Sequence, residues 1–318
     1  MNLKITATIE RWPVAGAFVI ARGAKTLVDV VMVQAQDGKH SGRGEGTPIY
    51  YNGETAEGCI AQINALPPGI NRASLQQILP PGAARNAVDC ALWDLGAKRA
   101  GVPLWQLAGF ARPRPLVTAM TVSLDRPERM EAAARELSRR TSLIKIKLAG
   151  EDDIARVEAV RRGAPDARLI VDANESWTNR DIAAEATALV HFGVELIEQP
   201  VRRGEDHRLD GIVSPIPLGA DESLHDRSDL ARCHGRYQAI NIKLDKAGGL
   251  TEALALRAEA QALGFKVMVG CMLATSLGIA PAFLVAQVAD WVDLDGALLL
   301  AKDRDRPLIL TGGLLSYS

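Results

Sequence analysis

The distribution of hydrophobic residues divides the chain into two parts with different patterns. From about residue 115 onward, short apolar and β-branched runs alternate with stretches rich in Ala, Leu, Glu and Arg. Eight of these runs predict buried strands, at 117–122, 143–148, 168–172, 194–198, 216–220, 239–243, 266–269 and 291–294. The stretches between them predict helices, including 127–140, 152–162, 181–192, 250–263 and 272–290. Repeated strand–helix units predict a parallel sheet, and eight strands predict a closed barrel of the TIM type.

The first 110 residues have a different pattern. Residues 1–14 and 26–38 predict antiparallel strands, and 82–101 predict an amphipathic helix. We therefore expect an α/β protein in which a small α+β domain (residues 1–112) precedes the barrel (residues 113–300). The Pro-rich stretch 111–115 is the expected linker, and the C-terminal tail, about 300–318, is expected to return to the first domain.

Composition and charge narrow the class of protein. The chain has 318 residues, of which 47% are apolar and 24% charged, and its formal net charge is -1. This profile predicts a soluble globular protein and gives no electrostatic reason to expect nucleic acid or an anionic membrane as partner. The sequence has no apparent secretory signal or membrane-spanning run, so a cytoplasmic protein is expected. The scattered cysteines and histidines predict neither a zinc cluster nor a disulfide framework.

Acidic residues stand at the ends of three consecutive predicted strands. The third strand ends in Asp172, the fourth in Glu198, and Asp221 follows the fifth. In a barrel the C-terminal ends of parallel strands meet around one mouth, so these carboxylates are expected to converge there. Buried carboxylates that converge need a cation, and oxygen ligands suit Mg²⁺, or Mn²⁺ in its place. The sequence therefore predicts a divalent-cation site.

Lysines stand at the ends of two other predicted strands. Lys145 and Lys147 are two residues apart on the second strand, so both point to one face. On the sixth strand, alternation directs Asn241 and Lys243 inward, whereas Lys246 falls beyond the strand. Strands two and six lie opposite each other in an eight-stranded barrel. Lys147 and Lys243 can then move a proton on and off opposite faces of one substrate carbon.

This geometry predicts a racemisation or epimerisation by 1,1-proton transfer. The cation would stabilise the negative charge formed when a proton leaves the carbon next to a carboxylate. Such a base needs a pKa lowered towards neutrality, and Lys145 beside Lys147 is expected to contribute to that lowering. We also expect Lys145 to contact the substrate carboxylate.

These elements together resemble the enolase superfamily, specifically its muconate lactonizing enzyme subgroup. The matching stretches are "KIKL", "VDAN", "EQP", "ADES" and "NIKLDKAGG", with "ARNAVDCALWDL" in the first domain. The resemblance covers the whole chain and implies a (β/α)7β TIM-like barrel with an N-terminal α+β capping domain. It also implies a homo-oligomer.

Within the subgroup the chain most resembles the epimerases of L-Ala-D/L-Glu dipeptides. The likeness implies that Asp293 and Asp295 of "DLDG" bind the substrate ammonium. It implies that Arg22, in the capping loop "FVIARG", pairs with the side-chain carboxylate of Glu. It further places three other residues in the pocket, namely Thr121, Cys271 and Leu273. A role in recycling or degrading murein peptides would follow from the same likeness.

Other activities use the same scaffold. They include o-succinylbenzoate synthesis, N-acylamino acid racemisation and muconate cycloisomerisation, whose substrates lack a free ammonium, so "DLDG" and Arg22 argue against them. A Schiff-base aldolase could use Lys243 but leaves Asp172, Glu198 and Asp221 unexplained. A non-catalytic binding protein would be expected to have lost one of these lysines or acids, and none is missing.

Overall fold

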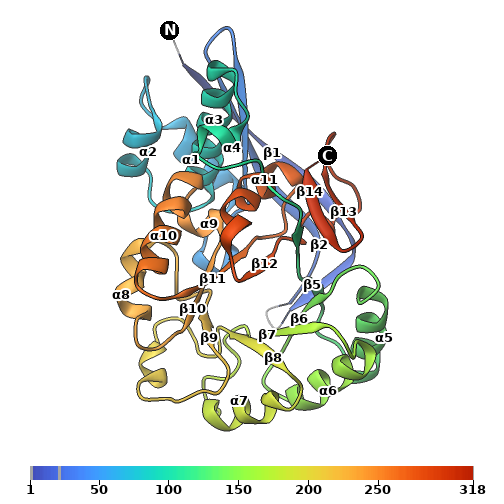
Figure 1. The fold of residues 1–318 in the computed structure, drawn as a ribbon. Helices are drawn as coiled ribbons and strands as arrows, with labels where there is room; N and C mark the ends of the chain where they lie inside the picture. Colours follow the sequence, from blue (N-terminus) through green and yellow to red (C-terminus); the bar gives the residue numbers. More distant parts are fainter. Residues whose placement is uncertain (1–2, 21–22, 318) are drawn as a thin grey trace.

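The computed structural model describes residues 3–20 and 23–317, and its larger part is a barrel of eight parallel strands (Figure 1). Neighbouring strands follow chain order around the sheet. The strands are β5 (Met120–Val122), β6 (Leu143–Lys147), β7 (Arg168–Asp172), β8 (Val194–Glu198), β9 (Leu218–Ala220), β10 (Ala239–Ile242), β11 (Lys266–Gly270) and β12 (Trp291–Asp293). The amide of Ala119 donates to the carbonyl of Val292 at 2.7 Å, which joins the two ends of the sheet. The predicted barrel is confirmed.

Helices surround the barrel and bury the outer faces of its strands. They are α5 (Pro127–Leu137), α6 (Asp153–Gly163), α7 (Ile182–Val190), α8 (Leu230–Cys233), α9 (Leu244–Ala247), α10 (Leu250–Ala262) and α11 (Ser276–Val285). The 3-10 helices η2 (Asp206–Leu209), η3 (Arg227–Asp229) and η4 (Ala286–Val288) complete the connections. Outward-facing strand residues such as Ile240 and Ile242 pack into this layer.

The interior of the barrel is apolar at one end and polar at the other. Seven buried side chains that lie at the start or in the middle of a strand, or just before one, form an interior cluster, namely Ala119, Leu143, Ile170, Leu196, Ala239, Met268 and Trp291. Two residues further along β6 and β7 the inward positions carry Lys145 and Asp172. Because every second side chain along a strand points inward, these polar side chains lie next to the interior cluster, at the C-terminal mouth of the barrel.

The N-terminal region, residues 3–110, is built on an antiparallel sheet of β1 (Lys4–Ile20), β2 (Gly23–Gln36) and β3 (Ser41–Gly46). It also contains η1 (Tyr50–Asn52), α1 (Ala56–Asn64), α2 (Arg72–Ile78), α3 (Ala83–Ala100) and α4 (Leu104–Leu107). Strand β3 lies directly against α3, since a Cβ atom on Gly44 would lie 2.2 Å from the Ala87 carbonyl oxygen. The predicted α+β domain is confirmed.

Helix α3 is buried on more than the one face that its sequence predicts, because it lies between the sheet and the barrel. On the barrel side, the Asn86 amide donates to Asp245 at 2.7 Å and the Trp93 indole donates to Thr251 at 2.9 Å. The Arg85 guanidinium donates to the carbonyl of Ala247 at 2.6 Å. The N-terminal region is therefore held to the barrel by buried polar contacts.

The long β1–β2 hairpin extends from the N-terminal sheet to the mouth of the barrel (Figure 1). Val14, Val28 and Val30 pack with Leu273 and Leu300 in one apolar cluster. Nearer the tip of the hairpin, the amide of Leu124, which follows β5, donates to the carbonyl of Val19 at 3.2 Å. The hairpin thereby places N-terminal side chains over the ends of the barrel strands.

The C-terminal tail forms a hairpin of β13 (Leu308–Thr311) and β14 (Leu314–Tyr317). Strand β14 pairs with β4 (Leu116–Val117), so the predicted first barrel strand, 117–122, is divided between two sheets. Before the hairpin, Arg304 forms ion pairs of 2.6 Å with Glu10 and Glu45 of the N-terminal region. The tail thus contacts both parts of the molecule.

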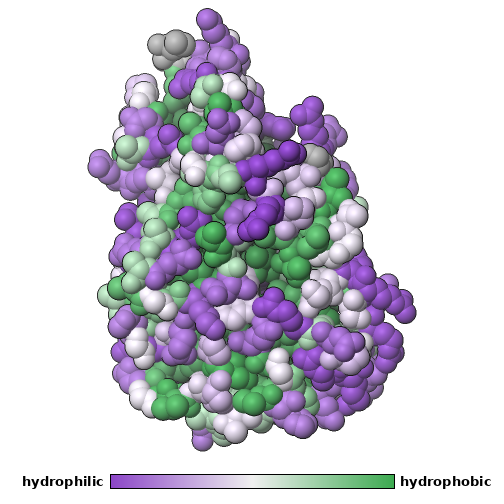
Figure 2. Space-filling model, viewed as in Figure 1, coloured by the Kyte–Doolittle hydropathy of each residue, from purple (hydrophilic) through white to green (hydrophobic). Residues whose placement is uncertain are grey.

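On the face that Figure 2 presents, polar residues are interspersed with hydrophobic ones, which gather in the middle of the view. No helix in the described ranges combines the length and the apolar character needed to cross a lipid bilayer.

Candidate active site

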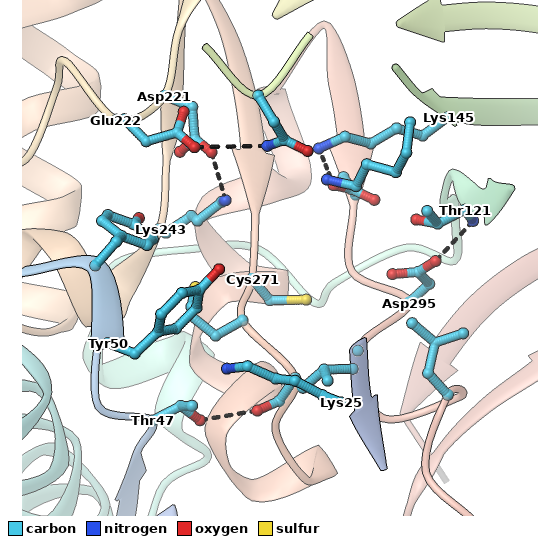
Figure 3. A pocket seen from close by; sticks show the side chains of 18 residues that line it. Lys25, Thr47, Tyr50, Thr121, Lys145, Asp221, Glu222, Lys243, Cys271 and Asp295 are labelled. Carbon is cyan, nitrogen blue, oxygen red and sulfur yellow. Dashed lines mark hydrogen bonds and ion pairs between the residues drawn. The ribbon is translucent and has the colours of Figure 1, made fainter. Parts of the chain in front are cut away.

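A pocket lies between the barrel mouth and the N-terminal region (Figure 3). The barrel contributes most of the residues predicted from the sequence, namely Thr121, Lys145, Lys147, Asp221, Lys243, Cys271, Leu273, Asp293 and Asp295. The N-terminal region contributes Lys25, Thr47, Tyr50 and Tyr51. Lys243 and Lys145 approach the cavity from opposite sides, as Figure 3 shows.

Strands β6, β7 and β8 bring two lysines and two acids together. Lys147 is the register partner of Asp172, and its ammonium lies 2.6 Å from an Asp172 carboxylate oxygen. Lys145 lies 3.1 Å from that same oxygen and 2.6 Å from Glu198. The Lys145 side chain is only 2% exposed, so carboxylates replace the water that an ammonium normally requires.

Asp221 is held by two ammonium groups on its two oxygens. Lys243, which directly follows β10, lies 2.7 Å from Oδ2 and lines the pocket. Lys246 lies 2.5 Å from Oδ1, and its side chain is 0% exposed. Lys246 also donates to the backbone carbonyls of Asp221 and Asn241. Lys243 therefore binds the Asp221 oxygen on the side of the pocket, and Lys246 binds the oxygen on the far side.

The ammonium groups of Lys145 and Lys243 are stabilised by the surrounding acids. Burial by itself lowers the pKa of Lys145, but ion pairs with Asp293, Glu198 and Asp172 outweigh burial and hold the pKa well above its usual value. For Lys243, burial is likewise outweighed, chiefly by Asp221, and the pKa is raised. The acids thus favour charged ammonium groups at both positions, and Lys243 does not have the lowered pKa that the sequence analysis expects of a base.

The pKa values of Asp172 and Glu198 are shifted in opposite directions. Burial opposes ionisation of Asp172, but the charges of Lys147 and Lys145 outweigh it and the pKa is lowered. The pKa of Glu198 is raised to about 7 by burial and by the neighbouring negative charge of Asp172. Lysines lower the pKa of both acids, but at Asp172 they outweigh burial, whereas at Glu198 burial and the charge of Asp172 outweigh Lys145 and Lys243.

The end of strand β12 carries Asp293 and Asp295, the two residues predicted to bind the substrate ammonium. In the structure each of them contacts a different protein group. Asp293 lies 2.9 Å from the Lys145 ammonium. Asp295 accepts the backbone N–H of Thr121 at 2.8 Å, and burial together with Asp293 raises its pKa to about 7. Both carboxylates line the pocket, so a cationic group of a ligand can reach them.

The residues after β11 form another wall of the pocket. Cys271 is partly buried, and burial raises the pKa of its thiol well above the usual value. The carbonyl of Leu273 accepts a hydrogen bond of 3.0 Å from the Thr47 hydroxyl of the N-terminal region. The remaining predicted residue, Arg22, lies outside the described residues.

The donor chemistry fits a divalent cation. Six buried carboxyl groups (Asp172, Glu198, Asp221, Glu222, Asp293 and Asp295) stand against four buried lysines (Lys145, Lys147, Lys243 and Lys246), so the acidic groups outnumber the basic ones by two. The available donors are oxygens, which Mg²⁺ prefers. Within the described ranges, no group of three His, Cys, Asp or Glu side chains has metal-binding spacing, since the carboxylates face lysines instead. The residues fit Mg²⁺ by charge and donor type.

Sequence reasoning missed two lysines at this site. Lys246 lies beyond the strand, as predicted, but the short helix α9 begins directly after Lys243 and turns Lys246 back beneath the end of β10, where it contacts Asp221. Its spacing of three residues from Lys243, followed by the Gly248–Gly249 helix end, was the available signal. Lys25 gave no signal, because its place in the pocket depends on how the N-terminal region packs on the barrel.

Comparison with known families agrees with this geometry. Residues 2–109 match the mandelate racemase/muconate lactonizing enzyme N-terminal domain, and residues 129–305 match the enolase C-terminal domain-like family. The chain belongs to this enzyme family. The superfamily predicted from the sequence is therefore confirmed, and the Schiff-base aldolase alternative is set aside.

Individual relatives are similar along nearly their whole length. The L-Ala-D/L-Glu epimerase of Escherichia coli is 45% identical over 309 residues, which cover 96% of each chain. The N-acetyl-D-glutamate racemase of a Pseudoalteromonas species is 42% identical over 293 residues, covering 90% of this chain and 92% of the relative. One relative is thus an epimerase and the other a racemase, and both are isomerases.

Solved structures extend the comparison to ligands. An enolase family member from Agrobacterium tumefaciens with homology to dipeptide epimerases, solved with sodium and L-Ala-L-Glu, superposes with a TM-score of 0.95 at 50% identity, covering 98% of this chain and 97% of that one. The dipeptide epimerase of Enterococcus faecalis, solved with Mg and L-Leu-L-Tyr, has a TM-score of 0.91 at 31% identity, covering 100% and 98%. The members of the family thus bind different dipeptides.

Proposed function

We propose that this chain is a dipeptide epimerase that inverts the α-carbon of the C-terminal residue of L-Ala-L-Glu, giving L-Ala-D-Glu. The observation that carries the proposal is the pair of lysines, Lys147 from β6 and Lys243 after β10, that line one pocket from opposite sides of the barrel. In an eight-stranded barrel, four strand positions separate opposite walls, which is the separation of β6 and β10.

The proton transfer follows from this placement. A neutral lysine on one face removes the α-proton, and the ammonium on the other face delivers a proton to the same carbon. One lysine gains a proton, the other loses one, and the configuration is inverted. In the reverse direction the two lysines exchange roles, so both epimers are substrates.

Asp172, Glu198 and Asp221 are the proposed ligands of Mg²⁺, with Mn²⁺ as a substitute. When bound, Mg²⁺ supplies positive charge that stabilises the negative charge developing on the substrate carboxylate. Lys145, which lies among Asp172, Glu198 and Asp293, is proposed to contact the same carboxylate once a substrate is present.

The rest of the dipeptide is proposed to occupy the remainder of the pocket. Its ammonium is assigned to Asp293 and Asp295, and its side-chain carboxylate to the region of Arg22. The other predicted pocket residues, Thr121, Cys271 and Leu273, line the walls around it.

A second candidate activity is racemisation of an N-acylated glutamate, favoured by the 42% identity to N-acetyl-D-glutamate racemase. The acyl group of that substrate carries no charge. Asp293 and Asp295 would then lack a cationic ligand group, whereas the free ammonium of L-Ala-L-Glu supplies one. We therefore prefer the dipeptide.

Proton NMR in D₂O tests the proposal. L-Ala-L-Glu and N-acetyl-L-glutamate are incubated separately with the enzyme, with and without added Mg²⁺. The proposal expects a Mg²⁺-dependent loss of the Glu α-proton signal together with the appearance of L-Ala-D-Glu. Faster exchange of N-acetyl-L-glutamate would favour the second candidate, and exchange of neither compound would contradict both.

We also propose a homo-oligomeric state, a cytoplasmic location and a role in recycling or degrading murein peptides, the first and the third from likeness to the family. Light scattering on the purified protein tests the first, because a monomeric mass would contradict it. Cell fractionation tests the second. Accumulation of L-Ala-D-Glu in a deletion strain grown with murein peptides tests the third.

A further inference from the structure

Lys25 is a pocket cation that the proposed proton transfer does not use. It lies on β2 near the tip of the β1–β2 hairpin, where its backbone is the register partner of Phe18. The hydrogen bond from Leu124 to the carbonyl of Val19 joins this part of the hairpin to the barrel. Lys25 therefore reaches the pocket from the side opposite the barrel floor (Figure 3).

The electrostatic setting of Lys25 differs from that of the barrel lysines. Lys147 and Lys243 each lie within 2.7 Å of a carboxylate oxygen, and Lys145 contacts three acids. Within residues 3–20 and 23–317, Lys25 forms no ion pair, and its ammonium lies 3.9 Å from the centre of the Tyr50 ring. An aromatic ring offsets only a small part of the charge of a half-buried ammonium.

Burial lowers the pKa of Lys25, and no acid among the described residues acts against this effect, in contrast to Lys145 and Lys243. The lowered pKa therefore agrees with the lack of an ion pair at Lys25. Of the described N-terminal residues that line the pocket, Lys25 alone carries a charge, since its companions are Thr47, Tyr50 and Tyr51. An anionic group of a ligand would restore the favourable environment that this ammonium lacks.

We propose that Lys25 is a specificity-determining residue that binds the side-chain carboxylate of the residue being epimerised. The inference rests on the proposed function and deepens it, because it restricts the substrates to dipeptides with an acidic C-terminal residue. The α-carboxylate and the reacting carbon remain with the barrel lysines. Lys25 acts from the N-terminal region, independently of what Arg22 contributes.

A matched pair of substrates tests this inference. L-Ala-L-Glu and L-Ala-L-Gln have nearly the same shape, but only the first carries the side-chain charge. The measured quantity is the ratio of kcat/KM for the Glu dipeptide to kcat/KM for the Gln dipeptide, obtained from α-proton exchange. The variants are Lys25→Met, which keeps the length of the side chain, and Lys25→Arg, which keeps the charge.

The ratio is expected to fall about 10- to 100-fold in Lys25→Met, mainly through KM for the Glu dipeptide, because a charge-assisted contact is lost. Lys25→Arg should keep most of the wild-type ratio. Lys4→Met, the same substitution at an exposed position on β1, is the control and should leave the ratio unchanged.

Other outcomes contradict the inference in distinguishable ways. Equal losses on both dipeptides in Lys25→Met would indicate a structural role only. An unchanged ratio, with the wild-type enzyme active, would overturn the Lys25 assignment and leave the proposed function intact. A wild-type enzyme that acts on neither dipeptide would contradict the proposed function, and this inference with it.

Discussion

The barrel mouth and the tip of the N-terminal hairpin both direct lysines into the same pocket, but they surround them differently. At the mouth, Lys145, Lys147 and Lys243 are buried against carboxylates. At the hairpin, Lys25 faces an aromatic ring. The difference agrees with the two proposals made above, in which the barrel lysines transfer protons and the N-terminal region distinguishes among substrates.

Removing either proposed base should give the largest effect. Lys147→Ala and Lys243→Ala are each expected to abolish epimerisation, with a loss of at least about 10²- to 10⁴-fold in kcat, because no other group can replace the missing proton carrier. Circular dichroism should remain that of the wild type. Near-normal turnover in one of them would remove that lysine from the mechanism.

Lys246 allows a test of the barrel mouth that does not touch the pocket directly. Lys246→Met leaves the rear oxygen of Asp221 buried without its cation, and breaking such a pair costs about 3–5 kcal/mol of stability. Chemical denaturation should reveal this loss, and Lys246→Arg should recover part of it. A loss below about 1 kcal/mol would mean that Lys243 alone satisfies Asp221.

Asp221 tests the proposed cation site. Asp221→Asn removes one negative charge from the set of acids and is expected to weaken Mg²⁺ binding by about tenfold or more, measured by calorimetric titration with the metal alone. The same titration on Glu222→Gln is the comparison. An unchanged affinity in Asp221→Asn combined with a loss in Glu222→Gln would transfer the ligand role to Glu222.

Substitution of Tyr50 is expected to give the smallest effect. It tests whether the Lys25 ammonium itself determines the preference for Glu over Gln. Tyr50→Leu removes the ring that contacts the Lys25 ammonium, a contact worth about 0.5–1 kcal/mol. The Glu/Gln preference should therefore fall only about two- to fivefold. A fall as large as that of Lys25→Met would mean that the ring, rather than the ammonium, determines the preference.

The barrel could be predicted from the sequence because its signals are local. The period of strand and helix gave eight strands, and alternation within β10 correctly directed Ile240 and Ile242 outward and Asn241 and Lys243 inward. The C-terminal ends of parallel barrel strands meet at one mouth, and this general rule was enough to predict that the charged residues at the strand ends lie together.

Features that depend on contacts between distant segments could not be predicted in this way. The sequence suggested that Lys145 would tune Lys147, but it did not reveal the contacts that surround Lys145 with Glu198 and Asp293. The position of Lys25 depends on how the β1–β2 hairpin packs on the barrel. Val28 and Val30 of the hairpin contact Leu273 there. The role suggested for Arg22 stays a prediction.

The central claim, that two lysines serve opposite faces of one carbon, is tested most directly by following α-proton exchange of each epimer separately. L-Ala-L-Glu and L-Ala-D-Glu are incubated in D₂O with Mg²⁺ and either Lys147→Ala or Lys243→Ala. Each variant should exchange the α-proton of one epimer without inversion, and the two variants should act on opposite epimers. If both variants exchanged the same epimer, or if either still produced the inverted dipeptide, the two-base account would be contradicted.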